Sequence, residues 1–235
     1  MTDAVVVLQA RMASTRLPGK VLSPLGTHTL LAHCIRRLQA SRIGPVVVAT
    51  TLRAEDDAVE AEARRLGCAV TRGPTDDVLA RLVMASHAVP SRWIVRATAD
   101  NPAVDIDAPS RLLRVLDAAD AVYGCERGLP YGAAVEAIAS SALHRAAALA
   151  TDPYDLEHVT PYIRRHPDTF GIVEPDAPVE VRRPDLRLTV DTADDLDFVR
   201  RVLGQIRAKA DPAPLQAIIA AADEVLRDTT AGAAT

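Results

Sequence analysis

One loop near the start of the chain concentrates three cations, Arg11, Arg16 and Lys20. Arginine offers a planar fork of donors to phosphate oxygens and lysine offers a point charge, so a mixed set can hold a polyphosphate. Ser14 adds a hydroxyl between them, and the small Ala10 leaves backbone N–H groups accessible to the same anion. A solvated basic loop is the alternative, but the cations follow a buried apolar run and a Pro-Gly turn stiffens the last of them. The loop is therefore predicted to bind a polyphosphate, although it matches neither the G-x-x-x-x-G-K-[ST] nor the G-x-G-x-x-G pattern.

Two aspartates are candidates for holding a metal ion beside that loop. Asp100 stands just beyond the apolar run 93–97, and Asp191 ends the apolar run 188–190, which is predicted as a strand. Because ligands bind outside the carboxyl ends of strands in an open parallel sheet, both carboxylates should lie near the loop. Mg²⁺ takes one or two carboxylates and completes its shell with phosphate oxygens and waters. For Asp191 the alternative is the N-cap of the next helix, unless Thr192 takes that role.

The elements that must position these residues alternate between strand and helix. Hydrophobic periodicity predicts strands at 5–8, 46–50, 69–71 and 93–97 and helices at 30–38, 55–66, 78–89 and 107–118. The stretch 121–136 is predicted to form irregular strands and a loop over the sheet. Helices at 140–150, 156–165, 193–206 and 214–227 and strands at 170–173 and 188–190 follow. We therefore predict an α/β fold, with a Rossmann-like, doubly wound and mainly parallel sheet covered by helices on both faces.

Composition limits the class of protein. The chain has 235 residues, a formal net charge of −4 and three cysteines, at 34, 68 and 125. The small negative charge argues against a broad nucleic-acid or membrane-surface role, so an anion site must be local. Widely spaced cysteines without C-x-x-C indicate free thiols in a reducing compartment. With no signal peptide and no apolar span, we expect a cytoplasmic protein that has one domain over 1–227 and a frayed tail over 228–235.

The motifs resemble those of a known family. Residues 9–22 read QARMASTRLPGKVL and resemble the signature loop of the cytidylyltransferases. That family includes the acylneuraminate and 3-deoxy-manno-octulosonate enzymes, and the resemblance is strongest to the spore-coat polysaccharide nucleotidyltransferases. It covers nearly the whole chain, continuing through RGPTDDVLAR at 72–81, RATADNP at 96–102, EHVTPY at 157–162 and LTVDTADDL at 188–196.

The resemblance implies a GT-A-like Rossmann fold and a Mg²⁺-dependent attack on the α-phosphate of CTP, with pyrophosphate leaving. It also implies a nucleotide-binding half at 1–120, an acceptor-binding half at 121–227 and a homodimer, for which 122–131 is the candidate contact. The partners expected are CTP and a small anionic acceptor, with no nucleic acid and no membrane.

The resemblance also assigns residues. The implied nucleotide-binding set is Leu8, Ala10, Arg11, Ser14, Lys20, Arg72, Asp77 and Asp100, with Arg11, Arg16 and Lys20 as catalytic cations and Asp100 and Asp191 as Mg²⁺ ligands. Arg72 and Asp77 are the candidates for contact with the cytosine and ribose, with Arg81 one helical turn along. For Asp77 a helix N-cap is the alternative. Arg96 either pairs internally with a carboxylate or contacts a ligand.

The acceptor side departs from the relatives. Glu136, Glu157 and His158 are the candidate acceptor-binding residues, and a hydrogen-bonded structural histidine is the alternative for His158. Where spore-coat-type proteins tend to show an aspartate, this chain has Ala133 or Ala134. The identity of the acceptor is therefore left open.

Two other functions are weighed. A GT-A glycosyltransferase would place a D-x-D string after a strand, but 105–107 looks like a helix start and 195–197 falls inside a predicted helix. A catalytically silent nucleotide-binding protein would not need the complete set of cations and both aspartates.

Overall fold

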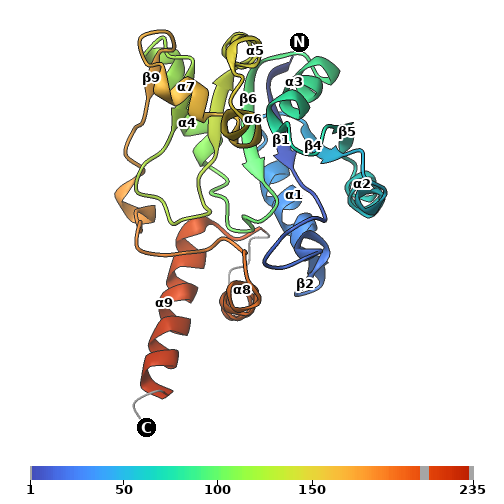
Figure 1. The fold of residues 1–235 in the computed structure, drawn as a ribbon. Coiled ribbons are helices and arrows are strands. Elements are labelled where there is room, and N and C mark those ends of the chain that lie inside the picture. Colours follow the sequence, from blue (N-terminus) through green and yellow to red (C-terminus); the bar gives the residue numbers. More distant parts are fainter. Residues whose placement is uncertain (1, 207–211, 233–235) are drawn as a thin grey trace.

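A seven-stranded, mainly parallel sheet forms the centre of the molecule (Figure 1). The computed structural model describes residues 2–206 and 212–232. The sheet strands are β1 (Thr2–Gln9), β4 (Val46–Thr51), β5 (Ala69–Gly73), β6 (Ser91–Thr98), β7 (Tyr123–Cys125), β8 (Glu136–Ala139) and β9 (Ile172–Val173), in the order β5-β4-β1-β6-β8-β7-β9. The first four strands in this order, β5, β4, β1 and β6, are parallel to one another. Strand β8 is antiparallel to both of its neighbours, β6 and β7. Since β8 pairs with β6, both halves of the chain share one sheet.

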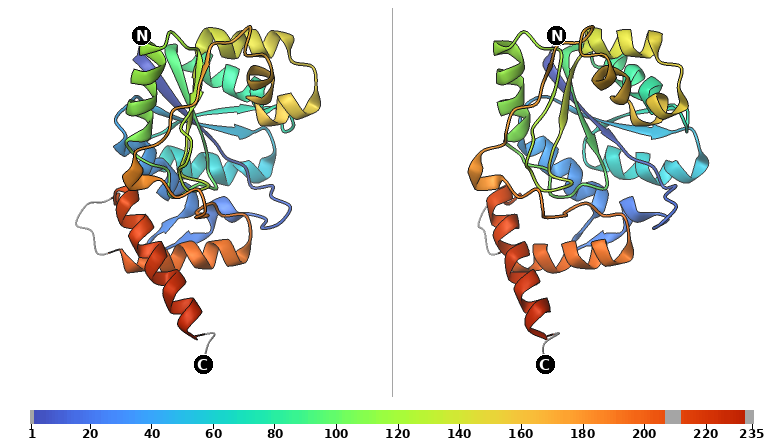
Figure 2. Two further views of the ribbon diagram at one scale, coloured as in Figure 1. Left: turned by 90° about the vertical axis from the view of Figure 1, so that its left-hand side faces the viewer. Right: turned by 60° about the vertical axis from the view of Figure 1, so that its left-hand side comes forward.

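Helices cover both faces of this sheet (Figure 2). The α-helices of the described chain are α1 (Leu30–Ala40), α2 (Asp57–Arg65), α3 (Val78–Ala88), α4 (Ala108–Ala118), α5 (Ser140–Leu149), α6 (Pro153–His158), α7 (Pro161–Arg165), α8 (Ala193–Gln205) and α9 (Leu215–Gly232), of which α8 and α9 lie away from the sheet. In the central strand, Val5 and Val7 pack with α3 and α5, whereas Val6 and Leu8 pack with α1 and α2. All four are fully buried, which explains the continuous apolar run. The predicted fold class is confirmed.

The C-terminal helices lie at the end of the molecule away from the N-terminus (Figures 1 and 2). One core cluster joins Leu188 to Val202 of α8 and Ile218 of α9. Another joins Val190 to α8 and to Leu25 of the hairpin β2 (Pro24–Leu25) and β3 (His28–Thr29). The segment leading to Asp191 is therefore held between α8 and the rest of the fold.

Two predicted elements in the second half are wrong in detail. Residues 188–190 are not a strand, because their backbone groups bond to loops: Leu188 N donates to Tyr131 O and Val190 N to Asp100 O, each at 2.8 Å. The predicted helix 156–165 is two helices, α6 and α7, separated at Val159, which has a positive φ.

Part of the predicted frayed tail, residues 228–232, is helical in the structure. Helix α9 continues past Arg227 to Gly232, and the Thr229 hydroxyl accepts a hydrogen bond from Arg201 of α8 at 3.1 Å. Packing on α8 thus extends a helix whose sequence becomes small and polar. Residues 233–235 lie outside the described part of the chain.

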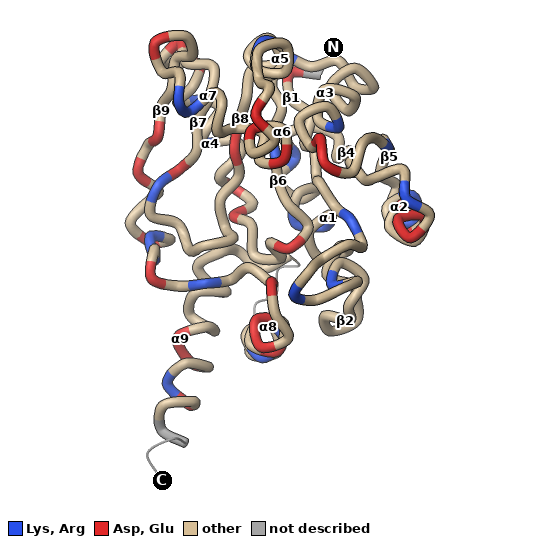
Figure 3. The backbone as a smooth tube through the Cα atoms, viewed as in Figure 1, with Lys and Arg blue, Asp and Glu red and all other residues tan. Residues whose placement is uncertain are grey.

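Charge is distributed without a dominant sign. Lys and Arg residues alternate with Asp and Glu residues along the backbone (Figure 3). Within the described ranges, none of the helices is long and apolar enough to cross a membrane.

Candidate functional site

A buried carboxylate fixes the loop after β1. Met12 N donates to Asp56 Oδ1 at 2.6 Å, and the Thr51 hydroxyl donates to the other oxygen of Asp56, which is fully buried. Gly19 N donates to Met12 O at 2.9 Å, with Gly19 at φ 71°, a conformation that glycine adopts without a Cβ penalty. The loop therefore folds back on itself and brings Lys20 to the edge of the sheet. Sequence reasoning missed Asp56, although an aspartate shortly after a buried strand was an available signal.

Lys20 lies between the two aspartates that were predicted to bind metal. Its Nζ is 3.3 Å from Asp100 Oδ2 and 3.1 Å from Asp191 Oδ1, and it donates to Val190 O at 2.7 Å. The Thr98 hydroxyl donates to the other oxygen of Asp100. The structure thus brings together three residues that the sequence places far apart.

Asp191 is not the cap of the following helix. The Thr192 hydroxyl accepts from Asp195 N at 3.2 Å, and Asp195 Oδ2 accepts from the N–H groups of Asp191 and Thr192, each at 2.9 Å. These bonds form a capping box at the start of α8. The Asp191 carboxylate is therefore available to cations.

Three cations surround that carboxylate. Lys20 and Arg16 contact Asp191 Oδ1, the latter at 3.0 Å, and Arg187 donates to Oδ2 at 2.6 Å. Burial raises the pKa of Asp191, but the bond and charge of Lys20, with Arg187 and Arg16, outweigh it and lower the pKa overall. The group is thus an anion at neutral pH. Arg187 belongs to no motif in the sequence and was missed.

The aspartate pair fits a divalent cation that arrives with a nucleotide. One oxygen from each of Asp100 and Asp191 lies within 3.3 Å of the same Nζ, so a cation in that space would meet both carboxylates. Within the described residues no group of three or more His, Cys, Asp or Glu side chains could hold a metal. A cation here would need further ligands from a bound molecule, and phosphate oxygens and water are those that Mg²⁺ prefers.

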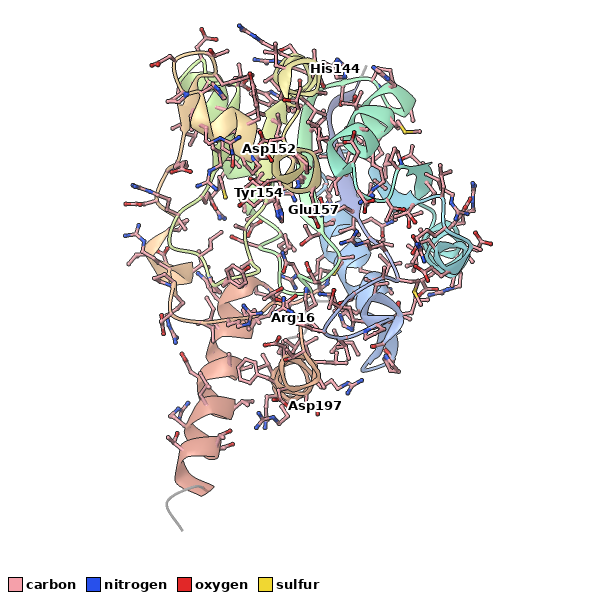
Figure 4. All side chains as sticks on the ribbon, viewed as in Figure 1. Arg16, His144, Asp152, Tyr154, Glu157 and Asp197 are labelled. Atoms are coloured by element: carbon pink, nitrogen blue, oxygen red, sulfur yellow. The ribbon has the colours of Figure 1, made fainter. Side chains whose placement is uncertain are left out.

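Two adjacent cavities open at the carboxyl ends of β1 and β6. The loop cavity, of about 290 Å³, is lined by the cationic loop and by Arg81, Glu157 and His158. The β8 cavity, of about 530 Å³, is lined by residues from Cys125 to Glu136 and by parts of β6. Five residues line both cavities, namely Gln9, Arg16, Thr98, Asp100 and His158. Molecules held in the two cavities would therefore meet at Asp100. Figure 4 shows two residues of the loop cavity, with Glu157 of α6 above Arg16 of the cationic loop.

Most of the predicted nucleotide-binding residues line the loop cavity. They are Ala10, Arg11, Ser14, Lys20 and Asp100. Three residues that were predicted for other roles, Arg16, Glu157 and His158, also line it. Leu8 does not, because its side chain points from β1 into the core beside α1 and is fully buried. A contact between Leu8 and the nucleotide would have to come from its backbone, and it stays a prediction.

Arg72 also lies away from the cavity. Its guanidinium donates to Asp57 Oδ1 at 2.6 Å, to Glu60 Oε2 at 3.0 Å and to backbone carbonyls that follow β4. Acidic residues on the adjacent α2 thus bind the side chain, and the predicted contact of Arg72 with the nucleotide stays a prediction. Asp77 accepts from Ala80 N at 2.7 Å as the N-cap of α3, the structural alternative considered for it.

Arg81 occupies the position at the cavity wall that was expected for Arg72. It is buried and donates to Pro74 O at 2.5 Å and to Thr75 O at 2.9 Å. Arg11 also reaches Thr75 O, at 3.5 Å, and lies 3.7 Å from Glu157. The segment after β5 is therefore tied to the cavity by Arg81 and Arg11.

Glu136 is held by internal bonds in the wall of the β8 cavity. Its carboxylate pairs with Arg96 and accepts from the Tyr123 hydroxyl at 2.6 Å and from the Thr160 hydroxyl at 2.8 Å. Burial raises the pKa of Glu136, but the charge of Arg96 and these bonds outweigh it and lower the pKa. Arg96 also donates to Gln9 Oε1 at 3.0 Å. Of the two alternatives for Arg96, the structure shows the internal pair.

None of the four aspartates of the two D-x-D strings lines the loop cavity or the β8 cavity. Asp105 is buried and accepts from Arg111 at 2.6 Å, while Asp195 forms the capping box of α8. Asp197 is exposed on α8 and pairs with Arg200 at 2.8 Å. These contacts speak against the metal site of a GT-A glycosyltransferase.

Known proteins resemble the chain over most of its length. The sequence model of the cytidylyltransferase family matches residues 5–213. Spore coat polysaccharide biosynthesis protein SpsF of Bacillus subtilis (strain 168) is 35% identical over 219 residues, covering 90% of each chain. The structure of a cytidylyltransferase from Leptospira borgpetersenii superposes with a TM-score of 0.86 at 27% identity, covering 98% of this chain and 96% of that one. That of a CMP:2-keto-3-deoxy-manno-octonic acid synthetase complexed with CTP shares the fold, with a TM-score of 0.63 at 23% identity, covering 86% and 98%.

The fold, the cationic loop and these relatives define a CTP-dependent nucleotidyltransferase. The chain belongs to the cytidylyltransferase family.

Proposed function

We propose that the protein transfers CMP from CTP to a small anionic acceptor, with Mg²⁺ bound and pyrophosphate released. The observation that carries the proposal is the cluster of Lys20, Asp100 and Asp191 at the junction of the two cavities. CTP would occupy the loop cavity and the acceptor the β8 cavity, so that the α-phosphate lies beside Asp100.

The chain's own residues supply most of what this reaction needs. Nucleotidyl transfer requires an in-line acceptor oxygen, neutralisation of charge at the α-phosphate and stabilisation of the pyrophosphate. Arg11, Arg16 and Lys20 line the loop cavity and provide the positive charge. Asp100 and Asp191 would hold the metal, which adds charge neutralisation between the phosphate oxygens when bound. Lys20 must then exchange its carboxylate partners for phosphate oxygens.

The β8 cavity, where the acceptor would bind, is lined by charged, polar and aromatic side chains. Arg16 brings a cation to it, while Asn101 and Tyr131 offer an amide and an exposed aromatic ring. Glu136 remains a wall residue in this proposal, Glu157 lines only the loop cavity, and His158 lines both cavities. A sugar acid, a sugar phosphate or a phosphonate meets the requirement for a small anion.

A pyrophosphate-release assay tests the proposal. The purified chain is incubated with each of the four NTPs, MgCl₂ and acceptors from the three classes. We expect pyrophosphate only with CTP, loss of release in EDTA and recovery with excess Mg²⁺. Release of a nucleoside diphosphate from a nucleotide sugar would instead identify a glycosyltransferase. CTP binding without any turnover, unchanged in Asp100→Ala, would identify a silent nucleotide-binding protein.

Assembly and location complete the proposal. A cytoplasmic homodimer is the form that the family resemblance implies. Light scattering on a sizing column distinguishes one 25.1 kDa chain from two.

A further inference from the structure

A strained turn lies beside the junction of the two cavities. Val159 has φ 72° and ψ −59°, and Thr160 N donates to His158 O at 2.9 Å. This is a γ-turn of the rare type with positive φ at its centre. A β-branched residue at positive φ is a genuine outlier, and such conformations persist only where the surroundings enforce them.

Contacts on both sides enforce this turn. The Val159 side chain is fully buried in the core beside α5 and α7, and its N–H donates to Asp155 O at 2.8 Å. Thr160 is buried too, and its hydroxyl donates to Glu136 at 2.8 Å. The residue before the turn, His158, is exposed and lines both cavities. The strain is therefore associated with the placement of one imidazole.

Four of the five residues shared by the cavities already have polar partners. Gln9 binds Arg96, Arg16 binds Asp191, and Thr98 and Asp100 bind each other. Asp100 also binds Lys20.

His158 differs from these four residues. Its ring packs on Tyr154, with centroids 4.4 Å apart, and within the described chain neither ring nitrogen has a hydrogen-bond partner. His158 is the last residue of α6, and Figure 4 shows two other residues of that helix, Tyr154 and Glu157, above Arg16. Among the shared residues, the imidazole is thus the group that is free to take up a proton.

We propose that His158 takes the proton of the acceptor's attacking hydroxyl, a role that rests on the proposed cytidylyl transfer. The hydroxyl oxygen bonds to the α-phosphorus of CTP while its proton passes to a ring nitrogen of His158. The bond from the α-phosphorus to the oxygen bridging to the β-phosphate breaks, and pyrophosphate leaves with that electron pair. The imidazolium then returns the proton to water.

This role also selects a class of acceptor. A phosphate or phosphonate oxygen is already deprotonated and needs no base, whereas a hydroxyl does. The proton transfer to His158 therefore applies to an acceptor that reacts through a hydroxyl. The charged groups that line the loop cavity with His158 are Arg11, Arg16, Lys20, Arg81, Asp100 and Glu157.

The test compares His158→Gln with wild type on two sets of acceptors. The hydroxyl set is 3-deoxy-manno-octulosonate and N-acetylneuraminate, and the phosphorus-oxygen set is methyl phosphate and methylphosphonate, neither of which has a hydroxyl on carbon. We expect wild type to use the hydroxyl set, and His158→Gln to lose about 100-fold or more in kcat with an unchanged KM for CTP.

A second variant separates proton transfer from packing. His158→Ala should regain activity when imidazole is added, which a purely structural role would not allow. His87→Gln, on α3, is the matched control and should behave as wild type.

Three outcomes would overturn the inference: activity of His158→Gln within about threefold of wild type, a wild type that uses only the phosphorus-oxygen set, or His158→Ala without imidazole rescue. The first two leave the proposed cytidylyl transfer standing. Failure of wild type to release pyrophosphate with any acceptor would remove both.

Discussion

Lys20 Nζ lies 3.1 Å from Asp191 Oδ1, although the two residues are 171 positions apart in the chain. The same ammonium group is 3.3 Å from Asp100 Oδ2. In this structure a lysine thus occupies the space between the two carboxylates to which the proposed function assigns a divalent cation. Both the stability of the nucleotide-free protein and its activity should depend on this residue.

Replacing Lys20 by methionine should leave two carboxylates close together without their shared cation. We expect a loss of about 2 kcal/mol in the free energy of unfolding without metal, part of which Mg²⁺ restores, and at least ~100-fold lower kcat. Urea unfolding with and without MgCl₂ and the pyrophosphate assay measure these effects. Arg92→Met, which removes an exposed pair with Asp117, is the control and should change neither quantity. Unchanged stability of Lys20→Met would contradict the proposed bridging role.

Asp56→Ala should loosen the cationic loop, because Met12 N would lose its acceptor in a buried place. We expect a loss of about 2 kcal/mol in stability and a rise of ~10-fold in the KM for CTP. Asp56→Asn keeps one oxygen for Met12 N and should be milder. Asp57→Asn changes the exposed neighbour and serves as the control. Equal KM values in wild type and Asp56→Ala would show that the loop does not need this anchor.

Stability should fall in acid through Asp195. Burial raises the pKa of Asp195, but Arg187 and the N–H groups of Asp191 and Thr192 outweigh it and lower the pKa to about 2. A depressed pKa in the folded state stabilises the fold above the unfolded value of about 3.9, and this contribution is lost as the pH falls towards 2. Urea unfolding of wild type and Asp195→Asn between neutral pH and pH 2 measures it. The two proteins should converge at the acid end, and a constant difference across the range would disprove the assignment.

Arg72→Ala and Arg81→Ala should separate the two arginines of one sequence motif. Arg72 contacts α2 and not the loop cavity, so its loss should leave the KM for CTP within about twofold. Arg81 holds Pro74 and Thr75 at the cavity wall, so its loss should raise that KM about 10-fold. Steady-state kinetics with CTP as the varied substrate compares them, and the reverse order of effects would restore the nucleotide role of Arg72.

The local sequence pattern was sufficient to predict the strands of the parallel half of the sheet and the position of the cationic loop. Apolar runs such as 5–8 occur as fully buried strands, and the residues that directly follow a parallel strand lie at its carboxyl end. That rule is enough to predict that Lys20 and Asp100 lie at one edge of the sheet. The sequence also offered Thr192, in place of Asp191, as the N-cap of α8. Its residue type and its spacing from Asp195 are those of a capping box.

The sequence by itself thus determined the class of fold, the cationic loop at the edge of the sheet and the family. Only the tertiary structure decided which side chains face the cavities. Asp191 reaches Asp100 through loop-to-loop bonds rather than a strand, Arg72 turns to acidic residues on α2, and the turn at Val159 exposes His158. The physical reason is that the partners of these groups are distant in the chain, whereas periodicity and capping depend on neighbours within a few residues.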